Sequence, residues 1–396
     1  MKVVSVVNFP VFGGPHNRNA WVANRLVDEG VTTVMVLPDD PGNAVDRLRE
    51  RGVHVRSIRL ARLRTSRDVR VQVRSLAGVG PGIARLRAVM REEQPDVVLV
   101  NGLPNPHAAI AARLEGIPVV WQILDTFPPA PYRWAMMQVV RRTAPVIMTS
   151  GMATAAVHPG ALAYGERLIN FFPAVDTARF ATSGASKRAA RRALGLDDDD
   201  VVVGNVNNIT LMKGHRWFVR GAAELRKTHP DVKFVVLGAS SPWHKSYTDG
   251  LWAEAEVLGL RLGTDLIVRD PGAGVAELAV AFDLFWLTSE PRSEGLSTVV
   301  GEAMSLGQPV VAADIGALRE SVADNVTGYI VPPRSPEALA EASRDLVNDP
   351  ALRSTIGAAG RRRAKALYSV EAVAAAHLAA YRAAIVNGPC RARRPV

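Results

Sequence analysis

The stretch 281–313, "AFDLFWLTSEPRSEGLSTVVGEAMSLGQPVVAA", contains the pattern that decides the fold. Its first apolar run, "AFDLFWLTS", predicts a buried strand, a polar loop follows, and the run "PVVAA" predicts the next strand. The segment between them predicts a helix that begins near Ser297 or Thr298, because Ser and Thr are favoured at helix N-caps. A strand, a helix and a second strand in this order indicate one unit of a parallel sheet.

The same alternation of strands and helices extends over most of the chain. Continuous apolar strands joined by helices indicate parallel sheets that are covered on both faces. The rhythm restarts after the polar stretch 181–200, which predicts an α/β fold of two doubly wound halves. The expected strands lie near 2–7, 32–37, 53–59, 96–100, 117–123 and 144–149 in the first half, and near 201–206, 232–238, 264–268, 283–287 and 309–313 in the second.

Two glutamates, Glu294 and Glu302, stand in the otherwise apolar opening stretch. A helix N-terminus at the carboxyl end of a strand is suited to phosphate, and Gly295 would let backbone N–H groups approach a ligand closely. Eight residues at the helical rise span at most about 12 Å. The two carboxylates would then accept hydrogen bonds from hydroxyls on either side of a diphosphate. The alternative is that both acids only cap and solvate a helix.

Length and composition describe a globular protein of two domains. The chain has 396 residues, of which 48% are hydrophobic and 22% charged, and this exceeds the usual size of a single core. The only cysteine, Cys390, excludes an intrachain disulfide. The chain contains no apolar run long enough for a spanning helix and no signal-peptide pattern. We therefore expect a cytoplasmic protein.

The formal charge of +10 is unevenly distributed, because the run Arg47–Arg74 holds ten arginines against Glu50 and Asp68. Such a surplus suits an anionic partner, which would be a phosphorylated substrate, a membrane surface or a nucleic acid. Arginines on a solvated face are the alternative. Nucleic acid is disfavoured because no binding module or aromatic interleaving accompanies the arginines. A peripheral contact with the inner membrane face remains compatible with the run.

The segment "EGLSTVVGEAMSLGQPVVAADIGALRESVADNVTGYIVPP" closely resembles the nucleotide-sugar signature of family 4 glycosyltransferases. The resemblance extends over nearly the whole chain, through "GGPHNRNAWVANRLVDEG", "QPDVVLVNG", "INFFPAVDTARF" and "VVVGNVNNITLMKGHRWFVRGAAELRKTHPDVKFVVLG". It implies a retaining enzyme with the GT-B fold, in which two Rossmann-like domains face each other across a cleft. Residues 1–180 would bind the acceptor and residues 181–368 the nucleotide sugar. A C-terminal helix at 369–387 would return to the first domain.

The resemblance also implies roles for the residues of the opening stretch. Glu294 would hold hydroxyls of the donor sugar, and Glu302 would bind the ribose hydroxyls. Backbone contacts to sugar and diphosphate would come from Gly295, Leu296 and Ser297. Glu294 and Glu302 would thus lie at the two ends of a clamp on the nucleotide sugar.

Further roles follow from the same resemblance outside that stretch. Lys213, in "LMKG", matches a lysine that neutralises the diphosphate as the leaving group develops negative charge. Gly13 and Gly14 match an N-terminal glycine loop that meets the diphosphate and the acceptor. His16, beside that loop, is a candidate for acceptor binding. Asp125 would meet the sugar or the acceptor hydroxyl, with helix capping as its alternative role.

The sequence departs from the family pattern at two positions. Asn208 stands where the family commonly has an arginine, five residues before Lys213, so one positive charge on the diphosphate is missing unless Arg292 or another arginine replaces it. Leu124 stands where a histidine usually contacts the donor sugar, which puts the sugar preference in doubt. The resemblance requires no divalent metal, because Lys213 and a helix N-terminus would supply the positive potential. The base, sugar, acceptor and oligomeric state do not follow from the sequence.

Three other functions remain open at this stage. A sugar-nucleotide epimerase or hydrolase would share the donor site without joining a second sugar. A catalytically impaired binding subunit would explain the departures at Leu124 and Asn208, although Glu294, Lys213 and Glu302 argue against it. A nucleic-acid binder is the weakest of the three.

Overall fold

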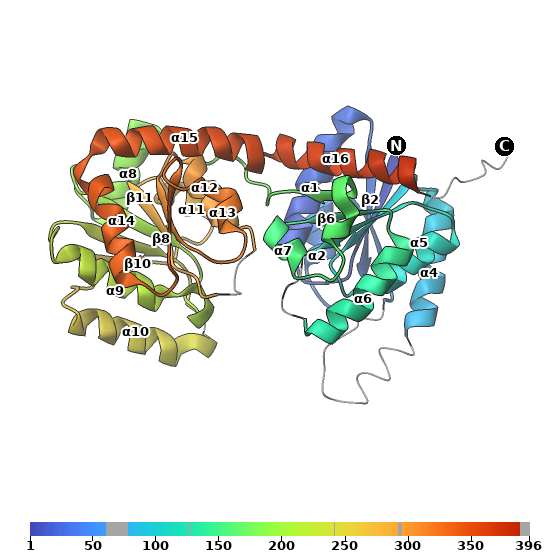
Figure 1. The fold of residues 1–396 in the computed structure, drawn as a ribbon, viewed down its shortest axis with the longest axis horizontal. Coiled ribbons are helices and arrows are strands. Elements are labelled where there is room, and N and C mark those ends of the chain that lie inside the picture. Colours follow the sequence, from blue (N-terminus) through green and yellow to red (C-terminus); the bar gives the residue numbers. More distant parts are fainter. Residues whose placement is uncertain (61–77, 125, 127, 241, 292–294, 389–396) are drawn as a thin grey trace. The chain divides into compact units, whose positions relative to one another are not determined.

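The structure is a computed structural model that describes residues 1–60, 78–124, 126, 128–240, 242–291 and 295–388. Two compact units divide the chain. Unit 1 comprises residues 1–174 and 370–396, and unit 2 comprises residues 175–369. Each unit is an α/β sandwich built on a parallel sheet (Figure 1).

Unit 1 contains a seven-stranded sheet in the order β3-β2-β1-β4-β5-β6-β7. The sheet is wound outward in both directions from β1, which is the arrangement of a dinucleotide-binding fold. Its strands are β1 (Lys2–Val7), β2 (Thr32–Pro38), β3 (His54–Ile58), β4 (Val97–Asn101), β5 (Val119–Ile123), β6 (Val146–Thr149) and β7 (Leu168–Asn170). All neighbouring pairs are parallel.

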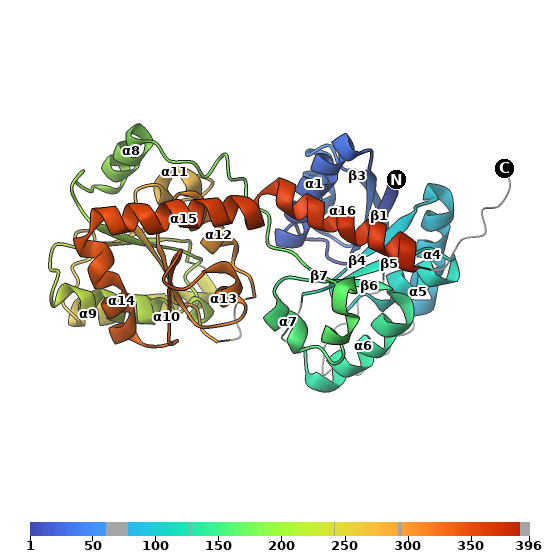
Figure 2. The same ribbon diagram turned by 45° about the horizontal axis from the view of Figure 1, so that its top comes forward.

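Helices cover both faces of this sheet because successive side chains of each strand point to opposite faces. Val4 and Val6 lie in the core beneath α4, α5 and α6, whereas Val3 lies in the core beneath α1 and α16. The C-terminal helix α16 therefore belongs to the unit that begins the chain, and Figure 2 shows it along the strands of unit 1. The helices of unit 1 are α1 (Gly14–Leu26), α2 (Ala44–Arg49), α4 (Val79–Glu93), α5 (Pro106–Leu114), α6 (Ala130–Thr143), α7 (Met152–Ala156) and α16 (Val370–Asn387), with 3₁₀ turns η1 (Val27–Glu29) and η2 (Leu162–Arg167).

Unit 2 repeats this plan with a six-stranded parallel sheet in the order β10-β9-β8-β11-β12-β13. Its core is centred on an aromatic cluster in which the ring centroids of Phe218 and Trp286 are 5.5 Å apart and those of Phe234 and Trp286 are 5.8 Å apart. Its strands are β8 (Val202–Val206), β9 (Lys233–Leu237), β10 (Leu266–Arg269), β11 (Leu284–Leu287), β12 (Val310–Ala313) and β13 (Gly328–Val331). Its helices are α8 (Gly184–Leu194), α9 (His215–Arg226), α10 (Lys245–Val257), α11 (Val275–Ala279), α12 (Thr298–Ser305), α13 (Leu318–Ser321), α14 (Pro336–Asn348) and α15 (Pro350–Tyr368), with 3₁₀ turns η3 (Leu211–Lys213) and η4 (Pro242–His244).

The opening stretch of the sequence folds as expected, with β11, α12 and β12 in succession and Thr298 as the first helical residue. Every expected strand overlaps an observed one. The expectation missed two edge strands, β7 and β13. Both are short, at three and four residues, and the run "GYIV" of β13 carries too little apolar pattern to stand out between its flanking turns.

Candidate functional site

The carboxyl edge of the unit 2 sheet contains a topological switch point. Strands β8 and β11 are hydrogen-bonded neighbours, but β8 continues through α9 to β9 on one side and β11 through α12 to β12 on the other. The chain therefore leaves the two strands toward opposite sides of the sheet, and open α/β sheets bind ligands outside the carboxyl ends of the strands at such a point. Ser297 of the opening stretch and Lys213 lie in these two connections.

Gly214 lets the two loops approach each other. Its φ is +64°, and a Cβ built on it would lie 1.9 Å from the carbonyl oxygen of Thr288, at the end of β11. Only glycine has room for both the left-handed backbone and this approach. The half-buried Lys213 directly precedes it and is thereby held near the carboxyl end of β11.

Glu290 fastens the same two loops and was not singled out from the sequence. Its backbone N–H donates to the carbonyl of Met212 at 2.9 Å. Its carboxylate accepts from Trp217 Nε1 at 2.7 Å and from Arg334 Nε at 2.7 Å. Hydrogen bonds to a carboxylate are stronger than those between neutral groups, so Glu290 positions the loop that precedes α12. An acid beside Pro291 carries no sequence signal of this role.

The N-terminus of α12 is well prepared to receive an anion. Ser297 is the N-cap residue and is buried, yet its side chain makes no capping hydrogen bond within the described part of the chain. The first N–H groups of an uncapped helix need an acceptor and attract negative charge. The loop before it is anchored, since the carbonyl of Gly295 accepts from the N–H of Ala317 at 3.3 Å. Leu296, which lies between Gly295 and Ser297 in the chain, is buried.

Glu302 lies in the second turn of α12, as expected. Burial raises the pKa of its carboxyl to about 7, and the positive charge of Arg179 opposes that rise. Among the described residues, no side chain donates a hydrogen bond to this carboxylate. A half-buried acid without a partner among the described residues is costly to ionise, which distinguishes Glu302 from a residue that solvates a helix.

The glycine loop of unit 1 follows β1 and leads into α1. The N–H of Gly13 donates to His16 Nδ1 at 3.2 Å, and His16 Nε2 lies 2.9 Å from the carbonyl of Phe9. Because Nδ1 accepts, Nε2 must carry the proton and donate to Phe9. Burial lowers the pKa of His16. Both ring nitrogens are therefore used to brace the loop, and the acceptor-binding role expected of His16 stays a prediction.

Alanine substitutions at Gly13 and Gly14 can test whether a ligand approaches this loop closely. A Cβ on either would meet nothing within 4 Å, and neither has a positive φ. We expect Gly14→Ala to leave the melting temperature unchanged and to lower donor turnover at least about tenfold if the methyl group blocks a ligand. Gly80→Ala, at an equally open glycine of α4, is the matched control. Full turnover by Gly14→Ala would remove the glycine loop from the site.

A polar cluster in unit 1 was also missed by the sequence analysis. Arg18 Nη2 donates to Gln122 Oε1 at 2.6 Å, and its guanidinium carbon lies 5.1 Å from the ring centroid of Phe171. Gln122 Nε2 in turn lies 2.9 Å from His377 Nε2 of α16. Burial lowers the pKa of Arg18 to about 10. The available signal was the polar residue within the apolar run of β5.

Several expected site residues lie outside the described residues. These are Glu294, Asp125 and Arg292, together with residues 61–74 of the Arg47–Arg74 run. The two departures are described. Asn208 is exposed in the loop after β8, and Leu124 is partly buried against the core of unit 1. The roles of these residues stay predictions.

Comparison with known families decides the class of protein. The profile "Glycosyl transferase 4-like domain" matches residues 13–205, and "Glycosyl transferases group 1" matches residues 186–363. The chain belongs to the family 4-type glycosyltransferases. Its two Rossmann-like domains are those of the GT-B fold.

Individual relatives match only part of this chain. The chain is 35% identical over 224 residues to a D-inositol 3-phosphate glycosyltransferase of Segniliparus rotundus, which covers 57% of this chain and 49% of that protein. It is 28% identical over 278 residues to an alpha-D-kanosaminyltransferase of Streptomyces kanamyceticus, covering 66% and 70%. The match to the first of these thus spans about half the length of that relative.

Solved structures agree with the fold assignment. HepE of Anabaena, crystallised in complex with UDP, has a TM-score of 0.80 at 21% identity over 96% of this chain and 98% of that one. Sucrose-phosphate synthase of Thermosynechococcus elongatus has a TM-score of 0.72 at 19% identity over 96% and 98%. Within the described residues, no helix of this glycosyltransferase combines the length and apolar character needed to cross a bilayer.

Proposed function

We propose that the protein transfers a sugar from a nucleoside-diphosphate sugar to an acceptor hydroxyl with retention of configuration. The observation that carries the proposal is the set of groups at the switch point of the unit 2 sheet. It combines a lysine, a helix N-terminus without a side-chain cap and a half-buried acid without a described partner. A diphosphate would take the first two, and ribose hydroxyls would donate to Glu302.

The chemistry follows from the charge that develops on the leaving group. As the glycosidic bond breaks, the nucleoside diphosphate gains negative charge, and Lys213 and the N–H groups of α12 are placed to stabilise it. We propose that these groups suffice without a divalent metal. The departing phosphate accepts the proton of the incoming hydroxyl on the same face of the sugar, so no protein nucleophile is required.

Unit 1 is proposed to bind the acceptor, through the loop of Gly13 and Gly14 and through Asp125. Relatives named for transfer to inositol 3-phosphate and for kanosaminyl transfer support a polyol, a glycan, a lipid-linked sugar or a natural product as the acceptor class. Structural neighbours crystallised with UDP and UDP-glucose make uridine nucleotides the first donors to examine. A soluble protein with peripheral contact to anionic membranes remains part of the proposal.

The test begins with a thermal-shift panel of nucleoside diphosphates and their sugars, since a ligand of the folded state raises the melting temperature. The donor with the largest shift is then incubated with candidate acceptors, and the anomeric configuration of the product is read by NMR. A product of inverted configuration would contradict retention. Loss of turnover when a metal chelator is added would contradict the metal-free proposal.

Two alternatives make different predictions in the same assay. Donor turnover at a rate unaffected by every acceptor would favour a sugar-nucleotide hydrolase or epimerase. Donor binding with no turnover would favour an impaired binding subunit, for which Asn208 and Leu124 are the motivation.

A further inference from the structure

A cavity in unit 1 lies at the opposite end of the sheet from the glycine loop. It has a volume of about 540 Å³ and is formed around Ala144 and Pro145, which immediately precede β6. The glycine loop, by contrast, follows the carboxyl end of β1. In a parallel sheet these are opposite edges, so the cavity is separate from the expected acceptor site.

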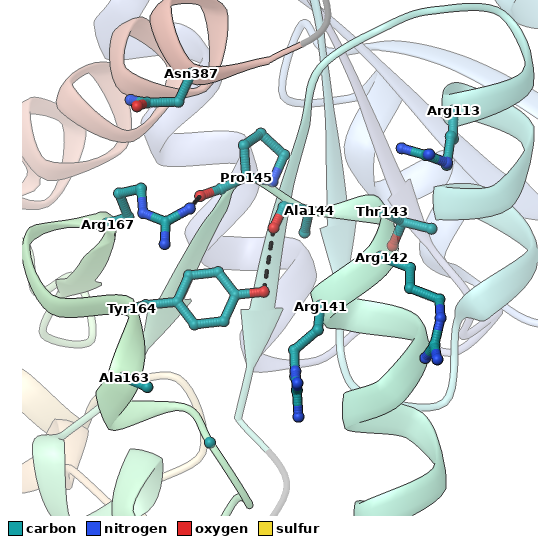
Figure 3. A pocket seen from close by; sticks show the side chains of 11 residues that line it. Arg113, Arg141, Arg142, Thr143, Ala144, Pro145, Ala163, Tyr164, Arg167 and Asn387 are labelled. Carbon is teal, nitrogen blue, oxygen red and sulfur yellow. Dashed lines mark hydrogen bonds between the residues drawn. The ribbon is translucent and has the colours of Figure 1, made fainter.

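Four arginines line this cavity, and they come from three different elements (Figure 3). Arg113 is in the last turn of α5, Arg141 and Arg142 are in the last turn of α6, and Arg167 ends η2. Tyr164 lies between Arg167 and Arg141, and its hydroxyl donates a hydrogen bond to the carbonyl of Ala144 at 3.1 Å.

These arginines lack the carboxylate partners that other arginines of unit 1 possess. Arg87 and Arg91 both pair with Glu115, at 2.6 and 2.9 Å, and Arg56 pairs with Glu93 at 3.0 Å. Within the described residues, no carboxylate lies within 4 Å of a guanidinium nitrogen of the four cavity arginines. Glu115 follows Arg113 by two residues, yet its contacts go to α4.

All four arginines are exposed at the cavity, and contacts with Tyr164 and Pro145 position Arg167. The guanidinium carbon of Arg167 lies 5.2 Å from the ring centroid of Tyr164, and its Nη1 donates to the carbonyl of Pro145 at 3.4 Å. Tyr164 lies between Arg167 and Arg141 in Figure 3, and the positive charges of both guanidinium groups act on its hydroxyl.

Helix ends account for only part of this charge. The C-termini of α5 and α6 each carry roughly −0.5 of an elementary charge, against four guanidinium groups. A large positive excess remains around one cavity. The volume of the cavity is within the usual range for small-molecule sites, roughly 300–1,000 Å³. A guanidinium group can donate two parallel hydrogen bonds to the oxygens of one phosphate.

We propose that this cavity binds a phosphate-bearing anion with at least two negative charges. The anion is either a soluble phosphorylated compound or the headgroup of an acidic phospholipid. Arg141 and Arg167 contact it from opposite sides, while Arg113 and Arg142 add positive potential. The proposal is independent of the donor site of unit 2.

The test uses the full chain with inorganic pyrophosphate as the probe, and titration calorimetry measures its binding. The wild type is expected to show two classes of site, one of which Lys213→Ala removes. The double variant Arg141→Gln, Arg167→Gln is expected to weaken the other class at least about tenfold, as loss of one to two charge-assisted contacts implies. The control is Arg192→Gln, Arg362→Gln, which removes the same charge at two arginines that are exposed, like those of the cavity, but lie outside it, and it is expected to bind like the wild type.

The possible outcomes separate the proposal from its alternatives. Equal pyrophosphate binding by the two double variants, or a wild type whose binding Lys213→Ala removes entirely, would overturn it. If the first pair unfolds, Arg113→Gln with Arg142→Gln takes its place under the same criteria. Failure of the donor site alone would leave the difference between the double variants intact.

A second experiment identifies the source of the anion. Flotation is measured with phosphatidylcholine vesicles that contain or lack phosphatidic acid. Binding that requires phosphatidic acid, is displaced by pyrophosphate and is lost in Arg141→Gln, Arg167→Gln assigns the cavity to a lipid headgroup. Pyrophosphate binding without vesicle binding assigns it to a soluble phosphorylated compound.

Discussion

Lys213→Ala is expected to lower kcat for glycosyl transfer by about 10²–10³-fold, which is the usual effect of removing one group that stabilises charge in the transition state. Lys213 lies at the end of η3, directly before Gly214, which packs against the end of β11. The charge that it would meet is greatest as the donor bond breaks. KM for the donor should therefore rise less than kcat falls. Steady-state kinetics with the donor identified by thermal shift is the measurement.

Lys227→Ala is the matched control for that experiment. Lys227 is exposed at the far end of α9 and pairs with Glu224, so its loss should change neither kcat nor KM. Lys213→Arg should recover part of the activity, since it keeps the charge but changes its geometry. A kcat for Lys213→Ala within about threefold of the wild type would exclude the lysine from the reaction, because that difference is below 1 kcal/mol.

Glu302→Gln is expected to stabilise the unliganded protein at alkaline pH. The folded-state pKa of Glu302 is about 7, above the ordinary glutamate pKa of 4.5. Below pH 4.5 the carboxyl is protonated in both states and costs nothing. As the pH rises toward 7, the unfolded chain ionises first, so the wild type loses stability and then reaches a plateau above the folded pKa. The total amounts to roughly 3 kcal/mol.

The amide of Glu302→Gln does not titrate, so this loss should disappear from the variant. Melting temperatures of the two proteins should therefore be similar near pH 4 and differ by several degrees at pH 8. Glu256→Gln, at an exposed glutamate of α10, controls for the change of net charge. Parallel pH profiles for wild type and Glu302→Gln would show that the carboxyl is not held at a raised pKa.

The same variant should bind nucleoside diphosphates less tightly. Ribose hydroxyls that donate to the ionised carboxylate would favour its charged form and lower its pKa. Nucleotide binding by the wild type near pH 6.5 should then release protons, which calorimetry in buffers of different ionisation enthalpy detects. Glu302→Gln should release none. Stabilisation of the unliganded fold together with weaker binding would identify Glu302 as a residue kept for function at a cost in stability.

The fold could be predicted from local patterns of apolar and polar residues in the sequence. Apolar runs such as "FDLFWL" are buried on both faces of a sheet, and turns rich in glycine and polar residues separate them from the helices. The strands that escaped prediction, β7 and β13, lie at sheet edges and are short. Their pairing depends on neighbours far away in the chain rather than on their own composition.

The site was predictable only where a motif marked it. The start of α12 and the place of Glu302 in its second turn were confirmed. Glu290, Arg18 and the arginines around Tyr164 were not foreseen, because each acquires its significance from residues distant in the sequence. Glu290, for example, contacts Trp217 and Arg334, which are 73 and 44 residues away.

The sequence by itself indicated most of the strands, the two-domain fold and the family, and it predicted which residues would bind a nucleotide sugar. Periodicity and motif spacing are local properties, and they survive without knowledge of the fold. Only the tertiary structure decided how those residues are charged and held. Burial raises the pKa of Glu302, Gly214 brings one loop against Thr288, and four arginines gather around one cavity. Desolvation, close approach and charge density are set by what surrounds a residue, and no stretch of sequence contains its own surroundings.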